Sequence, residues 1–269
     1  MADNVADRES FRIELSRSDW RFCMTVSVPK APMQLREILP ALRTLAGAVI
    51  DATTQSVKES GQKISCQKGC GACCRQLVAI SVVEAQELAE LVATLPPERQ
   101  AIIRARFDRA VDYLEDAGLL DPNEPIGERA LIIDNRGSRE TNLQELSRKY
   151  FSQQIACPFL EDESCTIHDA RPLVCREYHV TSPAERCAQL FDQAVDRVEV
   201  PFRLGDVLTR AGKKIFGAPA YSIPLVLALE YAEAHGTALK QSRNGTDMFE
   251  TIVSELACEP DVNVQFQRL

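Results

Sequence analysis

The chain opens with an alternation of apolar and polar positions that is interrupted once, by the polar run SRSD. The apolar positions of this alternation are Phe11, Ile13, Leu15, Phe22, Met24, Val26 and Val28. A period of two is typical of strands with one buried face, and a short polar interruption is typical of a turn. The pattern therefore predicts a small β-hairpin over residues 11–28, with Cys23 on the face opposite to the apolar side chains.

Helical periodicity replaces this alternation after residue 32. Apolar residues recur three and four positions apart over 32–60, which predicts a helix with a kink at Pro40. Ser81 and Glu84 have the spacing of a capping box for a helix that ends at a pair of prolines. A second helix then runs to Gly118, so we expect the two to form a helical hairpin.

The rest of the chain alternates between irregular and helical patterns. Residues 119–138 are predicted to be a long connection because they combine prolines, glycines and charges, and Thr141 is the predicted N-cap of the helix after it. Residues 157–187 are rich in turn residues and lack periodicity. The C-terminal third predicts an extended segment at 197–204 and helices near 205–215, 222–235 and 247–257, with stops at Gly217 and Gly236.

These patterns predict a mainly α protein, an irregular metal-stapled cysteine-cluster domain with helical hairpins and a small N-terminal β-hairpin. We expect three regions: the hairpin and helix of 1–60, a cysteine-cluster metal-binding domain at 61–190, and a helical region at 191–269 packed on it. The metal staple is expected because residues 157–187 offer too few periodic apolar positions to order themselves by core burial.

Composition and charge limit the kind of partner. The chain has 269 residues, of which 45% are hydrophobic and 26% charged, and a formal net charge of -8. Binding to nucleic acid or to an anionic membrane needs a basic surface, so neither is expected. The N-terminal residues lack the basic start and apolar stretch of a secretory leader, and no apolar run approaches the ~20 residues of a membrane span. We therefore expect a cytoplasmic location; the sequence identifies no protein partner.

Eight of the ten cysteines fall into two tracts. They are Cys66, Cys70, Cys73, Cys74, Cys157, Cys165, Cys175 and Cys187. In a reducing compartment, clustered cysteines indicate metal binding or catalysis rather than a disulfide framework. We predict all eight as metal ligands. Cys23 and Cys258 stand alone and are predicted to be small buried side chains.

The spacing of the first tract, C-x3-C-x2-C-C, bears on the kind of metal centre. Ligands two or three residues apart reach one metal from a tight turn, and Gly69 and Gly71 allow such a turn. Side chains of adjacent residues diverge, so Cys73 and Cys74 suit two metal ions, or two irons of one cluster. This favours an iron-sulfur cluster over zinc or iron ions held singly.

Several side chains near the cysteines are candidates to support the centre. Many thiolates around few divalent ions leave excess negative charge, which nearby cations could offset, and donors to a ligand sulfur tune it. The candidates for this cofactor-binding role are Lys68, Arg75, Arg171, Arg176 and Tyr178.

The stretches CQKGCGACCRQ and CPFLEDESCTIHDARPLVCREY together resemble the YkgJ-like cysteine-cluster family, a zinc- or iron-chelating domain. The resemblance covers residues 64–190 and implies that the cysteines from Cys66 to Cys175 bind metal, with Cys187 a weaker match. The family commonly has tyrosine at the position of His168, which implies that His168 lies beside the site without ligating. Arg171 and Pro172 match the family's RP pair, and Pro172 suits the first turn of a helix that carries Cys175.

Three classes of function are open at this point. The first is a metal- or cluster-binding protein with a storage, delivery or structural role. The second is an enzyme or enzyme accessory: Cys66, Cys70 and Cys73 have the spacing of radical S-adenosylmethionine enzymes, but the chain lacks their strand-helix alternation, and relatives of the cysteine domain are linked to protein lysine methylation. The third is a thiol redox protein using Cys73 and Cys74, a pair that could bridge only with strain. No catalytic residue is identified.

Overall fold

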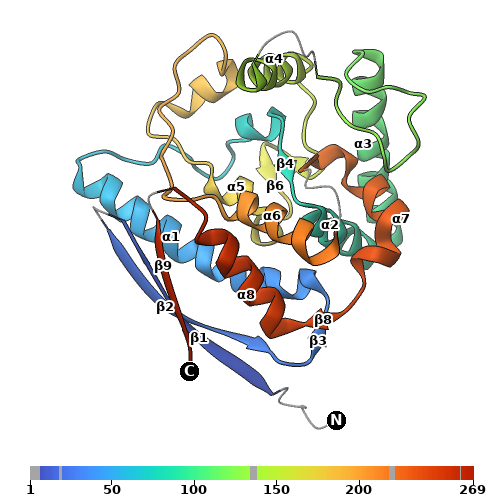
Figure 1. Ribbon diagram of the computed structural model, residues 1–269. Helices are drawn as coiled ribbons and strands as arrows, with labels where there is room; N and C mark the ends of the chain where they lie inside the picture. Colours follow the sequence, from blue (N-terminus) through green and yellow to red (C-terminus); the bar gives the residue numbers. More distant parts are fainter. Residues whose placement is uncertain (1–6, 18–19, 134–137, 218–221, 261) are drawn as a thin grey trace.

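The computed structural model describes residues 7–17, 20–133, 138–217, 222–260 and 262–269 (Figure 1). About 51% of the described residues are helical, which confirms the mainly α prediction. No helix in the described part of the chain is both long enough and apolar enough to cross a membrane.

The predicted hairpin is confirmed as strands β1 (Arg8–Ser16) and β2 (Arg21–Pro29), which pair antiparallel. A C-terminal strand, β9 (Asn263–Arg268), pairs with the other edge of β1, so the sheet order is β2-β1-β9. The sequence analysis missed β9, because its side chains are mostly exposed and the alternation there is weak. Only the pairing with β1 identifies it as a strand.

Helices cover one face of this sheet and bury the alternating apolar residues (Figure 1). The helices on the sheet are α1 (Leu39–Glu59) and α8 (Gly245–Leu256), and α6 (Leu204–Phe216) packs on α8 and joins the same core. Their shared core joins residues from both ends of the chain: Phe11 stacks on Phe249 with ring centroids 5.0 Å apart. The N-terminal hairpin is therefore held by C-terminal helices.

The start of α1 differs from the prediction. Pro40 does not kink the helix but stands in its first turn, after a short 3-10 helix η1 (Leu35–Ile38). Proline is tolerated there because the first backbone N–H groups of a helix have no partner within it.

A second core lies between α2 (Val82–Thr94), α3 (Pro97–Asp116) and α7 (Ala228–Leu239). The predicted capping box of α2 is confirmed: the Ser81 side chain accepts from the Glu84 N–H, and the Glu84 carboxylate accepts from the Ser81 N–H at 3.0 Å. Two residues separate α2 from α3. Short strand pairs tie distant segments, β3 (Pro32–Met33) to β8 (Arg243–Asn244) and β4 (Ala79–Ile80) to β7 (Ile223–Pro224).

Three predicted boundaries are wrong. Helix α4 (Arg139–Ser152) is capped by Ser138, whose hydroxyl accepts from the Thr141 N–H, so Thr141 is not the cap. Helix α7 begins at Ala228 rather than near 222, because Ile223–Pro224 pairs as β7 and the 3-10 turn η5 (Leu225–Leu227) follows it. Gly236 lies inside α7, whereas Gly217 ends α6 as predicted, with φ of 66°.

The predicted connection at 119–138 is confirmed over 119–133, which contain neither helix nor strand; its residues 134–137 lie outside the described residues. Arg129 anchors it by ion pairs with Glu115 and Glu230. Gly127 has φ of +86°, and a side chain there would meet Ala234 of α7. The close approach of the loop to α7 therefore depends on glycine at this position.

Candidate metal centre

The two cysteine tracts lie against each other. The first contains the 3-10 helix η2 (Ala72–Arg75), and the Cys157 N–H donates to the Cys74 carbonyl at 2.8 Å. The Ser65 N–H donates to the Val180 carbonyl at 2.9 Å, so both sides of the first tract are tied to the second. These bonds join segments about 80 to 115 residues apart in the chain through backbone groups alone.

An ion pair adds to this contact. A tight hairpin, β5 (Leu160–Glu161) and β6 (Ser164–Cys165), carries Glu163 at its turn, where φ is 55°. The Glu163 carboxylate accepts two bonds from Arg75, at 2.6 and 2.9 Å, and Arg75 also donates to the Gly71 carbonyl at 3.0 Å. A Cβ on Gly71 would lie 2.4 Å from the Glu163 carboxylate, so a larger residue there would displace that carboxylate from its bonds with Arg75.

Helix α5 (Leu173–Glu177) carries Cys175 and is fixed by buried carboxylates at both ends. Glu84 accepts from the Leu173 N–H at 2.7 Å, and Glu177 accepts from the Leu204 N–H at 2.8 Å. Pro172 precedes the helix as its N-cap residue, which agrees with the prediction that a helix starts there. Cys175 is thereby held at a fixed depth between the two cores.

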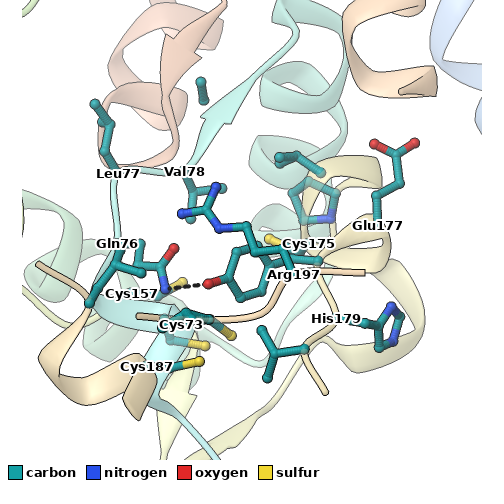
Figure 2. Close-up of a pocket in the computed structure, with 18 of the residues that line it drawn as sticks. Cys73, Gln76, Leu77, Val78, Cys157, Cys175, Glu177, His179, Cys187 and Arg197 are labelled. Carbon is teal, nitrogen blue, oxygen red and sulfur yellow. Dashed lines mark hydrogen bonds between the residues drawn. The ribbon is translucent and has the colours of Figure 1, made fainter. Parts of the chain in front are cut away.

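All eight clustered cysteines line one cavity of about 2010 Å³. Figure 2 shows Cys73, Cys157, Cys175 and Cys187 around it, together with Gln76, His179 and Arg197. The two other cysteines are elsewhere and exposed, Cys23 on the outer face of β2 and Cys258 just after α8. The prediction that these two cysteines are buried is wrong, because Cys23 lies on the solvent-facing side of β2 and Cys258 lies beyond the end of α8.

Burial keeps the thiols protonated in the metal-free protein. It raises the pKa of the Cys157 thiol to about 12 and that of Cys175 well above its ordinary value. The pKa of Cys73 is raised first by a hydrogen bond with Cys74 and then by burial. Burial likewise raises the pKa of three more thiols, Cys66, Cys165 and Cys187.

Mutual electrostatic effects divide the thiols into two groups. The charges of Cys66 and Cys70 raise the pKa of Cys187, and that of Cys70 raises the pKa of Cys66. Separately, the charges of Cys157 and Cys165 raise the pKa of Cys175, and that of Cys165 raises the pKa of Cys157. Cys73 acts on members of both groups, namely Cys66, Cys157, Cys165, Cys175 and Cys187. Cys73 is therefore within electrostatic range of both groups.

The candidate supporting residues are placed differently. Arg171 lies beside the thiols: it lowers the pKa of Cys66, Cys73 and Cys165 against the larger effect of burial, and its buried Nε has no hydrogen-bond partner among the described residues. Lys68 also lines the cavity. Arg176 lies outside it and donates to the Arg171 carbonyl at 3.1 Å.

Tyr178 connects the thiols to side chains that the sequence analysis did not single out. Its hydroxyl accepts from Gln76 Nε2 at 3.2 Å, and Tyr178 lowers the pKa of the Cys187 thiol against the larger effect of burial. The Arg197 guanidinium lies over the Tyr178 ring, 5.2 Å from its centroid. Gln76 and Arg197 carry no sequence signal of their own, since only the fold brings them to Tyr178.

Two of the three histidines, His168 and His179, line the cavity. His168 lines the cavity but its side chain is 64% exposed and pairs with Asp169 at 3.5 Å. Burial and then Arg171 lower the pKa of His179. His235 is not part of the cavity lining, and its Nε2 is hydrogen-bonded to the Gly127 carbonyl at 3.0 Å. The cavity lining thus offers eight cysteine sulfurs and two histidine rings as donors.

This donor set fits zinc and iron, because thiolates are ligands of structural zinc and of iron-sulfur clusters. In the described parts of the chain, no three His, Cys, Asp or Glu side chains are already arranged around a point that would hold an ion. Binding thus requires the thiols to lose their protons and to turn toward the metal within the cavity.

Comparison with known families agrees with the donor set. Residues 120–196 match the family CxxCxxCC, described as "Putative zinc- or iron-chelating domain", which confirms the resemblance over this segment. The match includes the second cysteine tract, whereas the run of four cysteines at 66–74, one residue longer than the family's name spells, lies before it. No curated protein and no solved structure matches the chain.

Proposed function

We propose that this protein binds zinc or iron through the thiolates of its eight clustered cysteines, at two metal positions that share Cys73. The observation that carries this proposal is the meeting of both tracts in one cavity lined by all eight thiols. The matched family, zinc- or iron-chelating by its description, supports the same chemistry.

The two positions follow from the grouping of the thiols. Cys66, Cys70 and Cys187 would hold the first, and Cys157, Cys165 and Cys175 the second. Each group supplies three sulfurs, and structural zinc takes four ligands. Cys73, which is within electrostatic range of both groups, would complete either or bridge both, while its neighbour Cys74 would supply the remaining sulfur.

The charge of such a centre needs a counter-ion, and Arg171 supplies it. Two divalent ions with eight thiolates carry an excess of four negative charges. The Nε of Arg171, which has no partner among the described residues, is a donor available to a ligand sulfur, and the Tyr178 hydroxyl, which lowers the Cys187 pKa, is another. Donors of this kind fix the orientation of a ligand and tune its charge.

An iron-sulfur cluster is the finer form of this proposal. The adjacent cysteines and the tight turn around Gly71 favour a polynuclear centre, as in cysteine-ligated clusters. Purification without oxygen decides the matter: a brown protein whose charge-transfer absorption is lost on oxidation would establish iron-sulfur, and a colourless protein with stoichiometric zinc would refute it.

Metal analysis of single variants tests the two positions. The anaerobically purified protein should carry metal at both, Cys187→Ser should lose the metal of the first, Cys165→Ser that of the second, and Cys73→Ser should lose most of both. The exposed cysteines outside the tracts give matched controls, Cys23→Ser and Cys258→Ser, which should retain full metal content. Less than one metal atom per chain in the unaltered protein, or equal loss in the controls, would contradict the proposal.

A further inference from the structure

Two arginines line the cysteine cavity without a carboxylate partner. Arg197 and Arg203 are both exposed and both belong to the lining. Among the described residues, neither guanidinium forms an ion pair or donates a hydrogen bond. Elsewhere in the protein, by contrast, the half-buried Arg36, Arg43 and Arg129 each pair with a glutamate. The two positive charges at the cavity are therefore available to a ligand.

The fold brings both arginines to the C-terminal end of α5. The Arg197 guanidinium lies over the Tyr178 ring, 5.2 Å from its centroid. Leu204, the residue after Arg203, donates its N–H to the Glu177 carboxylate at 2.8 Å. Burial raises the pKa of Glu177 and of Tyr178, and the charge of the neighbouring arginine lowers each. Two segments separate from α5 thus place their positive charges beside two consecutive residues of the cavity wall.

Other charged groups in the lining leave these two arginines free. Glu199 and Asp206 also line the cavity, but within the described parts of the chain neither is within ion-pair distance of a cation. Asp206 lies in the first turn of α6, where the helix dipole stabilises a carboxylate. Arg171 acts on the thiols and is the proposed counter-ion of the metal centre. Arg197 and Arg203 act instead on residues 177 and 178.

The cavity has room for a ligand in addition to a metal centre. Its volume is about 2010 Å³, whereas pockets for small ligands usually measure about 300–1,000 Å³. Apolar side chains of the same segments also line it, Val174 from α5 and Val198 and Val200 from the stretch between the two arginines. Figure 2 shows Arg197 in this cavity together with Val78. Apolar walls with a few placed charges are typical of sites for small organic molecules.

We propose that a small organic anion carrying a carboxylate or phosphate group binds in this cavity beside the metal centre, with its oxyanion paired to Arg197 and Arg203. Guanidinium suits this role because it can donate two parallel N–H bonds to a carboxylate or a phosphate. The apolar part of the ligand contacts Val174, Val198 and Val200. The site uses none of the eight cysteines, so the inference goes beyond metal binding.

Fluorine NMR of the full chain as purified tests this site with two anionic probes, para-fluorobenzoate and para-fluorophenyl phosphate. The neutral para-fluorobenzamide is the reference. At least one anion should bind saturably and about tenfold or more tightly than the amide, because a paired charge adds to the apolar contact. The tighter of the two anions identifies the headgroup. Equal binding of the amide, or no saturable binding of either anion up to about 10 mM, would overturn the proposal.

Variants locate the anion on the two arginines. Arg197→Gln and Arg203→Gln should each weaken the anionic probe about tenfold, the loss expected for one charge-assisted hydrogen bond. Arg104→Gln makes the same charge change at an exposed arginine of α3 outside the lining, and it should bind the probe as the unaltered protein does. Glu199→Gln removes a negative charge from the lining and should strengthen binding. Equal loss in Arg104→Gln, or no loss in either lining variant, would contradict the assignment.

Metal analysis of the same variants keeps this result apart from the metal proposal. Arg203→Gln should retain the metal content and melting temperature of Arg104→Gln while losing probe affinity. An arginine variant that loses metal in step with probe binding would assign that arginine to the metal centre and sink the anion site. Unaltered protein that binds the anion but carries no metal would contradict the metal proposal alone.

Discussion

Metal affinity should depend steeply on pH, because binding competes with protons on buried thiols. The proposed second metal position would use Cys157, with a pKa of about 12, and Cys165 and Cys175, whose pKa values burial also raises. At pH 7–8 these three thiols are protonated in the metal-free protein, so an ion that binds all three releases about three protons.

The magnitude follows from this count. Each released proton changes the binding constant tenfold per pH unit, which is about 1.4 kcal/mol. Three protons give about 1,000-fold per unit, or about 4 kcal/mol, and the sign is fixed: affinity falls as pH falls. For ordinary thiols with pKa near 8.5, metal affinity would stop rising with pH above that value. The buried Cys157 stays protonated beyond pH 9, so metal binding should still release at least one proton there.

Zinc competition against a chelator of known protonation constants, from pH 6.5 to 9.5, measures this slope. Cys187→Ser is the matched variant, since it isolates the second position. A slope below one proton per ion, or a plateau by pH 8.5, would refute the assignment of buried, protonated thiols as ligands.

Three further predictions concern stability. Burial raises the Glu177 pKa to about 8, above its ordinary value, so the metal-free protein should lose up to about 1.4 kcal/mol of stability per pH unit as pH rises from 4.5 to 8. Urea unfolding at pH 5 and 7.5 measures this loss, which should be smaller in Glu177→Gln. Gly127→Ala should destabilise by about 1–3 kcal/mol through strain and the clash with Ala234, measured by the same unfolding. Cys175→Ser should speed hydrogen exchange of 155–190 more than that of α2 and α3; equal protection after metal removal would show that the metal is no staple.

The hydrogen-exchange prediction depends on a balance between two contributions: the contacts that join the tracts without metal, and the entropy cost of ordering the second tract. The backbone bonds of Ser65 and Cys157 and the Arg75–Glu163 pair join the tracts without metal. Exposed ion pairs contribute about 0–1 kcal/mol, and ordering a residue costs about 1–2 kcal/mol. The few contacts of the irregular second tract therefore leave room for metal binding to add to its stability, which is what the exchange experiment measures.

Local patterns in the sequence were enough to predict several features. The alternation at 11–28 predicted the β1–β2 hairpin, and Ser81 with Glu84 predicted the start of α2, because both depend on residues close together in the chain. The two cysteine tracts indicated metal chemistry for the same reason: the density of thiols is a property of the sequence itself, and the family match over 120–196 agrees with it.

Tertiary structure alone decided the rest. Strand β9 exists by pairing with β1 across nearly the whole chain, and β7 replaces the first turn of a predicted helix by pairing with β4. The electrostatic grouping of the thiols with Cys73 and the approach of Arg171 both depend on contacts between distant segments. Periodicity reports which face of an element is apolar, but which segment meets that face is set by long-range packing and backbone pairing, and these leave little trace in the sequence of either partner.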